Sequence, residues 1–100
     1  MMIVEFAQVR GNDGDELARR VQSALEVLAS APTCTDARAY RCIEDPDAFI
    51  FAVTWDSVDA HHEFRAGGKF AEYRSHIQDL LAETPSFLHY SLVAAAGAET

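Results

Sequence analysis

The chain has 100 residues, of which 49% are hydrophobic, and a formal net charge of -8. This length suits one domain, predicted over residues 1–100, with a thin core. An acidic surface is repelled by nucleic-acid backbones and anionic membranes, so neither is expected as a partner. Because the sequence has neither a signal-peptide pattern nor the ~18 consecutive apolar residues of a spanning helix, we expect a cytoplasmic protein.

The two cysteines are predicted to be free thiols. Cys34 and Cys42 lie in one predicted strand, about 26 Å apart at ~3.3 Å per residue, which is too far for a disulfide. They belong to no CxxC or Cys/His spacing, so no structural zinc is expected. Two unpaired thiols indicate a reducing compartment.

The first part of the chain predicts a strand, a helix and a second strand. Residues 2–10 are β-branched and apolar with polar residues at alternate places, which is typical of a strand. Over residues 15–31, apolar residues recur at helical spacing, and Asn12 or Asp13 is the expected N-cap. Residues 33–44 alternate again but have no cleanly apolar face, which predicts a bent or edge strand.

A hairpin is predicted next. Asp45-Pro46-Asp47 has the composition of a tight turn, because proline presets its own dihedral angle and aspartate accepts local backbone bonds. Residues 48–55 follow as a strand with apolar residues on both faces. Such a strand is covered on both sides.

The remaining chain predicts a broken helix and a last strand. Ser57 caps a helix that Gly67-Gly68 interrupts, and Thr84-Pro85 ends its second piece. That second piece carries its apolar residues on one stripe, formed by Phe70, Tyr73, Ile77 and Leu80. Residues 87–94 read as the last strand.

This order of elements, β-α-β-β-α-β, predicts an α+β ferredoxin-like fold. Its four-stranded antiparallel sheet has both helices on one face. The other face would leave an apolar patch larger than monomers usually expose. We therefore expect a homodimer that packs sheet against sheet.

Several short motifs resemble the antibiotic biosynthesis monooxygenase (ABM) family, whose members look like dimeric α/β barrels. The resemblance follows the element order of nearly the whole chain and rests on Trp55-Asp56-Ser57, Ala60-His61-His62, Phe70, Tyr73, Pro85 and His89-Tyr90. It implies a pocket between helices and sheet in each subunit. It also implies oxidation of anthrones or dihydroquinones with O2 and without metal, flavin or haem.

The chain departs from this family pattern at specific positions. Many relatives place a histidine nine residues after the tryptophan, where this chain has Phe64. The asparagine, tryptophan and histidine of the haem-degrading branch correspond to Gln8, Phe64 and Arg74. Haem is therefore not expected, and no cofactor is predicted.

The catalytic candidates are His61, His62 and Arg65. The two histidines point some 100° apart on a helix, so at most one faces the sheet, where a neutral imidazole could act as a general base. The alternative for either is solvated helix surface. No third ligand accompanies His62-Glu63, so no metal site is predicted. Arg65 is the candidate partner of a substrate oxyanion, with Arg41, Arg74 and Tyr73 as alternatives.

The candidate substrate-binding residues are mainly aromatic. Trp55 could stack on a planar ligand and donate its indole N–H, or serve as a core residue only. The other members of the predicted wall are Phe51, Phe70, Tyr73 and His89, where either His89 or Tyr90 faces the helices.

These residues support one preferred function and two alternatives. The preferred hypothesis is a cofactor-independent monooxygenase that oxidises a small aromatic, a hydroquinone or a polyketide anthrone, with O2. A cyclase or isomerase on the same scaffold would need the acid and base but no oxygen. A non-catalytic ligand-binding or structural dimer would need neither.

Overall fold

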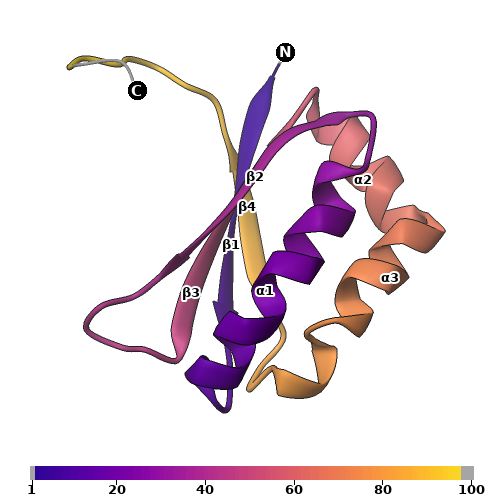
Figure 1. The fold of residues 1–100 in the computed structure, drawn as a ribbon. Coiled ribbons are helices and arrows are strands. Elements are labelled where there is room, and N and C mark those ends of the chain that lie inside the picture. The colour runs from indigo at the N-terminus through magenta and orange to yellow at the C-terminus, as the bar shows by residue number, and fades with distance from the viewer. Residues whose placement is uncertain (1, 98–100) are drawn as a thin grey trace.

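Four antiparallel strands form one sheet in the order β2-β3-β1-β4, and the helices cover one of its faces (Figure 1). The computed structural model describes residues 2–97. The strands are β1 (Ile3–Arg10), β2 (Cys34–Arg41), β3 (Ala48–Trp55) and β4 (Ser86–Tyr90). The helices are α1 (Gly14–Ala29), α2 (Val58–Ala66), α3 (Gly68–Ser75) and the short 3-10 turn η1 (Gln78–Leu80). The predicted ferredoxin-like fold is confirmed.

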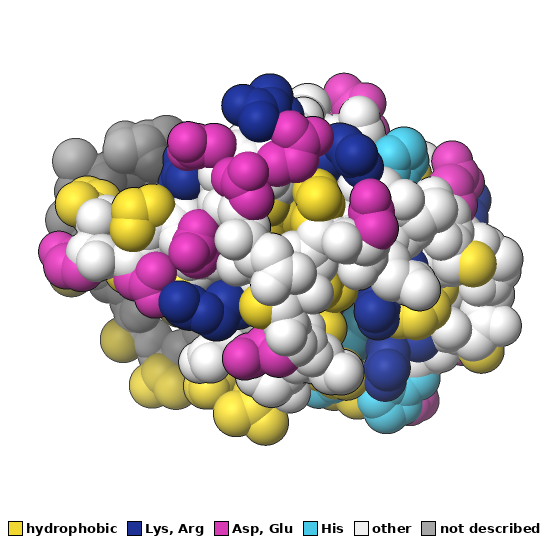
Figure 2. All heavy atoms as spheres, turned by 90° about the horizontal axis from the view of Figure 1, so that it is seen from below, with side chains coloured by type: hydrophobic (Ala, Val, Ile, Leu, Met, Phe, Trp, Pro, Cys, Tyr) yellow, Lys and Arg dark blue, Asp and Glu magenta, His cyan; other side chains and the backbone are white. Residues whose placement is uncertain are grey.

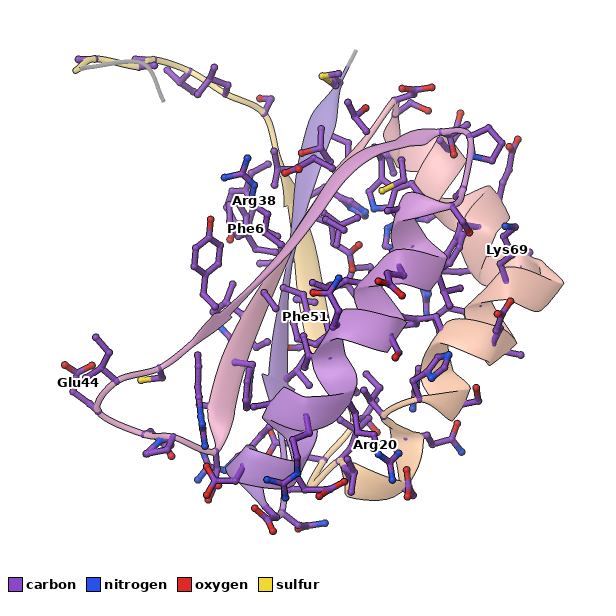
Figure 3. All side chains as sticks on the ribbon, viewed as in Figure 1. Phe6, Arg20, Arg38, Glu44, Phe51 and Lys69 are labelled. Carbon is purple, nitrogen blue, oxygen red and sulfur yellow. The ribbon has the colours of Figure 1, made fainter. Side chains whose placement is uncertain are left out.

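The core lies between the sheet and the helices. Strands β1 and β3 pair in register from Ile3 opposite Trp55 to Arg10 opposite Ala48, so their alternate residues share one buried face. Figure 3 shows Phe51 on the helix side of the sheet and Phe6 on the open side. The core cluster joins both strands to the apolar stripe of α1, which includes Leu17, Val21, Ala24 and Leu28.

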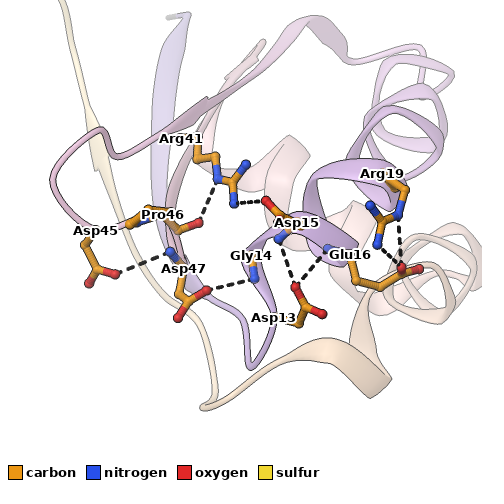
Figure 4. A network of polar contacts seen from close by, with 9 residues as sticks. All are labelled: Asp13, Gly14, Asp15, Glu16, Arg19, Arg41, Asp45, Pro46 and Asp47. Carbon is orange, nitrogen blue, oxygen red and sulfur yellow. Dashed lines mark hydrogen bonds and ion pairs between the residues drawn. The ribbon is translucent and has the colours of Figure 1, made fainter.

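A polar network fixes the start of α1 against the β2–β3 turn (Figure 4). Asp13 caps the helix by accepting from the backbone N–H groups of Asp15 and Glu16, at 3.1 and 3.3 Å. Arg41 donates to the Pro46 carbonyl and to Asp15. Position 14 must be glycine, because a Cβ there would lie 2.0 Å from the Pro46 carbonyl oxygen.

Strand β4 is shorter than the sequence predicts. It ends at Tyr90, and residues 91–97 leave the sheet without regular structure, whereas the prediction ran to residue 94. Tyr90 pairs with Val4, near the beginning of β1, so the next residues have no further partner strand within the described chain. Strand β4 therefore ends where β1 begins.

The second helical piece is also shorter than predicted. The chain leaves helical dihedral angles at Ile77, which has φ -129°. This change turns the Ile77 side chain fully into the core. Leu80 then packs from the 3-10 turn, so the predicted stripe is confirmed although the continuous helix is not.

Strand β2 is bent by an irregularity between Cys34 and Asp36, in agreement with the mixed pattern of its sequence. The bend lets Cys34 and Ala37 both pack against the core. The strand ends at Arg41, earlier than predicted, because the chain enters the turn. Both cysteines are free thiols.

The outer surface carries many carboxylates. Figure 2 views the molecule from the end where α1 begins, and acidic side chains are spread over this end with basic side chains between them. Among the described residues, no helix has the length and apolar character that crossing a membrane requires.

Candidate active site

A cavity of about 80 Å³ lies between the sheet and the two short helices α2 and α3. Its walls are largely aromatic, because β3, β4 and both helices each contribute phenylalanine side chains: Phe51, Phe64, Phe70 and Phe87. Polar groups interrupt this wall at Glu5, His61, Arg65, Tyr73 and Arg74, and the lining is completed by Ala7, Leu28, Val53, Thr84 and Pro85. An apolar cavity with a few converging polar groups is the usual form of a small-molecule site.

Glu5 and His61, both buried, form one wall of the cavity, and Trp55 lies behind them. The Trp55 indole N–H donates to Glu5 Oε1 at 3.0 Å. His61 Nε2 lies 3.3 Å from the same oxygen. The imidazole stacks on the indole with ring centroids 5.1 Å apart and an 18° angle between the planes. Trp55 is therefore used twice, as a donor to Glu5 and as a platform for His61.

A second histidine lies behind this wall and closer to the surface. His61 Nδ1 lies 2.7 Å from Nε2 of His89 on β4, within hydrogen-bond distance. His89 is half-buried, whereas His62 is exposed. The sequence left open which of the two adjacent histidines faces the sheet, and the structure identifies it as His61, which is 4% exposed.

Two arginines bring positive charge to the cavity lining. The Arg65 guanidinium lies over the Phe87 ring, 4.7 Å from its centroid, and the Arg74 guanidinium lies 5.8 Å from the centroid of Phe70. Arg74 Nε is buried and has no hydrogen-bond partner among the described residues. A buried donor without a partner is costly, so this N–H is free to bind an oxygen atom of a ligand.

Burial controls the protonation of the cavity groups. It raises the pKa of Glu5, although the hydrogen bond from Trp55 and the charge of Arg65 oppose the shift. Burial, helped by the charges of His89, Arg65 and His62, lowers the pKa of His61 to about 4, so this imidazole is neutral near pH 7. Burial and the charge of Glu5 raise the pKa of the Tyr73 hydroxyl, which stays a neutral donor.

The predicted site residues divide into three groups. His61, Arg65, Phe51, Phe70 and Tyr73 line the cavity. Trp55 and His89 lie behind the wall in contact with His61, and Trp55 is fully buried. His62 is exposed outside the cavity, and Arg41 belongs to the α1 network.

Sequence reasoning missed Glu5 as a site residue. In β1 the buried set is Ile3, Glu5, Ala7 and Val9, so a carboxylate stands in the middle of an apolar face. That position was a usable signal, because a charged side chain is almost never fully buried without a partner. Gln8, considered as the counterpart of a family asparagine, is exposed and lines a groove on the open face of the sheet.

Comparisons with known proteins agree with this architecture. Residues 1–76 match the family model named antibiotic biosynthesis monooxygenase, ABM. The chain belongs to the ABM family. A Bordetella bronchiseptica structure named for this family is 30% identical, with a TM-score of 0.86 over 93% of this chain and 98% of the other. A sequence comparison with curated proteins finds no match.

Other solved structures share the fold at lower identity. A protein from Nitrosomonas europaea, named for the family, is 13% identical, with a TM-score of 0.78 and coverage of 96% of this chain and 94% of that one. SnoaB from Streptomyces nogalater, described as a cofactor-independent oxygenase, is 12% identical, with a TM-score of 0.80 and coverage of 94% and 95%. Family membership supports a general monooxygenase-like role for this ABM protein.

Proposed function

We propose that this ABM protein is a cofactor-independent monooxygenase that oxidises a small hydroquinone with O2. The observation that carries the proposal is the cavity itself, whose aromatic lining also contains a carboxylate, an imidazole and two arginines. Such a set of groups suits an aromatic ring that gives a proton to a basic group and whose negative charge is then stabilised by a cationic group. The description of SnoaB as a cofactor-independent oxygenase on the same fold supports the reaction class.

The size of the cavity favours a single ring over a three-ring anthrone. Its volume is about 80 Å³. Pockets for drug-sized ligands hold roughly 300 Å³ or more, and an engineered apolar cavity of about 150 Å³ accepts benzene. A monocyclic hydroquinone therefore requires the smaller adjustment of the walls.

The proposed roles follow from position. His61 takes part in proton transfer, because it lies at the cavity wall whereas His62 is exposed. Arg74 and Arg65 stabilise the phenolate, and the neutral Tyr73 hydroxyl donates to a second oxygen. Phe51 and Phe70 hold the ring, and the electron-rich anion then reduces O2 directly. One oxygen atom stays on the ring, and the other leaves as water with the two hydrogens that the hydroquinone loses.

Oxygen uptake tests this function. The metal-stripped protein should consume O2 with single-ring hydroquinones faster than their spontaneous oxidation, and chelator should not abolish the activity. Replacing Arg74 by glutamine should lower kcat about 10²-fold, because a buried donor to the developing anion is removed. The readings are an oxygen electrode trace and the product spectrum.

The control is Arg19→Gln, because Arg19 is an exposed α1 residue that pairs with Glu16 outside the cavity. This variant should keep the wild-type rate. If no hydroquinone or anthrone gives uptake above background, the oxygenase assignment is wrong. Ring closure or isomerisation without O2 consumption would then indicate a cyclase, and ligand-induced melting shifts alone would indicate a binding protein.

We also propose that the protein works as a homodimer joined through the open face of its sheet. This face exposes Phe6, Tyr40, Leu88 and Tyr90 by 40 to 65% of their surface, and Phe6 and Tyr90 pack edge to face. Leu92 and Val93, in the segment that leaves the sheet, are exposed by 81% and 94%. Contiguous apolar surface of this kind marks an interface.

Mass in solution tests the dimer. Light scattering at micromolar concentration should give twice the 11.0 kDa mass of the chain. Leu88→Lys should shift the mass to that of one chain, because an ammonium group would be buried at the interface. Gln22→Lys, on the exposed side of α1, should leave the dimer intact. A wild-type protein with the mass of one chain would contradict the proposal.

A further inference from the structure

Each ring nitrogen of His61 already has a partner. Nδ1 lies 2.7 Å from His89 Nε2, and Nε2 lies 3.3 Å from Glu5 Oε1. The Trp55 indole covers one face of the ring. A ligand in the cavity therefore meets the imidazole without a free nitrogen, and the group that first takes its proton has to be sought elsewhere.

Glu5 has the free atom that His61 lacks. The hydrogen bonds of the described chain use only its Oε1, and the residue lines the cavity although it is 8% exposed. Oε2 is thus available to a ligand. Burial raises the pKa of this carboxyl, which moves it toward the range in which carboxylates act as general bases at neutral pH.

We propose that Glu5 is the catalytic base that receives the substrate's proton and that His61 and His89 are positioning residues that connect this carboxylate to solvent. The inference rests on the function proposed above. It adds a base contributed by the central strand of the sheet and a proton path that leaves the cavity through β4.

The proton balance is consistent with the distances between these groups. With Glu5 ionised, Oε1 accepts the N–H of Trp55 and faces a protonated His61 Nε2, while His61 Nδ1 accepts the Nε2 proton of His89. A substrate hydroxyl gives its proton to Glu5 Oε2 and keeps the electron pair as a phenolate. After O2 has reacted, Glu5 returns this proton to the reduced oxygen, which takes up the second hydrogen that the hydroquinone loses and leaves as water.

The two histidines allow Glu5 to exchange a proton with solvent even when a ligand fills the cavity. A solvent proton that binds His89 at Nδ1 reaches Glu5 by two shifts, from His89 Nε2 to His61 Nδ1 and from His61 Nε2 to Glu5 Oε1. The reverse shifts release it. The 3.3 Å step is long for the ligand-free state, and contacts of this kind tighten when a substrate is bound.

Several charged or titratable groups face Glu5 and influence how its ionisation changes with pH. His61 and Arg65 approach from α2, Tyr73 approaches from α3, His89 from β4, and the thiol of Cys34 interacts from β2. The pKa of His61, about 4, means that this ring passes a proton on at neutral pH and does not store a positive charge.

Glu5→Gln tests the base in the reaction. Glutamine keeps the shape and can still accept from Trp55, so the fold should persist and kcat should fall between 10²- and 10⁴-fold with little change in KM. The rise of kcat with pH that ionisation of Glu5 causes should vanish in the variant. The matched control is Glu44→Gln in the exposed turn, which should keep both rate and pH profile.

An anaerobic measurement tests the same base without oxygen chemistry. 4-Nitrophenol is added at a pH where the free phenol is largely neutral, and the absorbance of its anion is read on binding. Wild type should convert the bound phenol to its anion, whereas Glu5→Gln should reduce the bound anion at least tenfold. His89→Gln should leave the extent of conversion near that of wild type and slow its rate.

The two measurements separate the inference from the proposed function. In one outcome, the wild type forms bound anion in a way that depends on Glu5, but no hydroquinone gives O2 uptake. This result would support Glu5 as the base and refute the oxygenase function. O2 uptake and bound anion that are both unchanged in Glu5→Gln would overturn the base and leave the oxygenase standing. Absence of bound anion in the wild type would also overturn the inference.

Discussion

Replacing Trp55 by alanine should lower the free energy of unfolding by about 3 to 5 kcal/mol. The indole is fully buried and belongs to the core cluster, so its removal leaves a large cavity. It also removes one donor from the buried Glu5 carboxylate. Urea unfolding of wild type and variant at pH 7 measures the difference. A loss of unfolding free energy below 1 kcal/mol would show that the indole does not support the cavity wall.

Trp55→Phe separates the hydrogen bond from the packing. Phenylalanine keeps most of the apolar contact and lacks the N–H, so we expect a smaller loss of about 1 to 3 kcal/mol. The same substitution in a Glu5→Gln background should cost less, because no buried charge then depends on the donor. A double-mutant cycle reports this coupling directly.

Acidification should destabilise the protein through His61. Its pKa is lowered to about 4 in the folded state, from 6.5 as the ordinary value. A group with a lowered folded pKa contributes stability that is present above the unfolded value and is lost as the pH falls toward the folded value. Between pH 7 and pH 4.5 this loss amounts to roughly 2 to 3 kcal/mol.

His61→Gln isolates this contribution from that of the many carboxylates. Wild type should lose more stability than the variant between pH 7 and pH 4.5, as measured by urea unfolding. Glu5 acts in the opposite direction, because its raised pKa makes its contribution greatest at low pH. The control His76→Gln, outside the cavity, should keep the wild-type pH dependence. Equal pH dependence in wild type and His61→Gln would contradict the assignment.

The elements that the sequence predicted best are those with local signals. Strand β3 begins and ends at the predicted residues, because its apolar run lies between a proline turn and a helix cap. Ser57 accepts from Ala60 N–H as expected of that cap. The predicted end of β4 was wrong, because the length of this strand depends on its pairing with β1, which is distant in the sequence. The composition of β4 alone could not reveal where this pairing stops.

The candidate site was predicted in part for the same reason. A helical wheel shows that only one of His61 and His62 can face inward, and the packing of Phe64 on Trp55 decides which one. The aromatic wall follows from periodicity, since Phe51 and Phe70 fall on apolar faces. The partners of Trp55 and His61 could not be read from the chain, because Glu5 lies 50 residues from Trp55 in the sequence.

The acidic exterior has a consequence for how the substrate arrives. With a net charge of -8, the surface opposes the approach of a phenolate that is already ionised in solution. A neutral hydroquinone meets no such barrier and can lose its proton only after it has entered. The negative charge that Arg74 would stabilise is thus created inside the cavity. The concentration of anions in the surrounding buffer therefore has little influence on this charge.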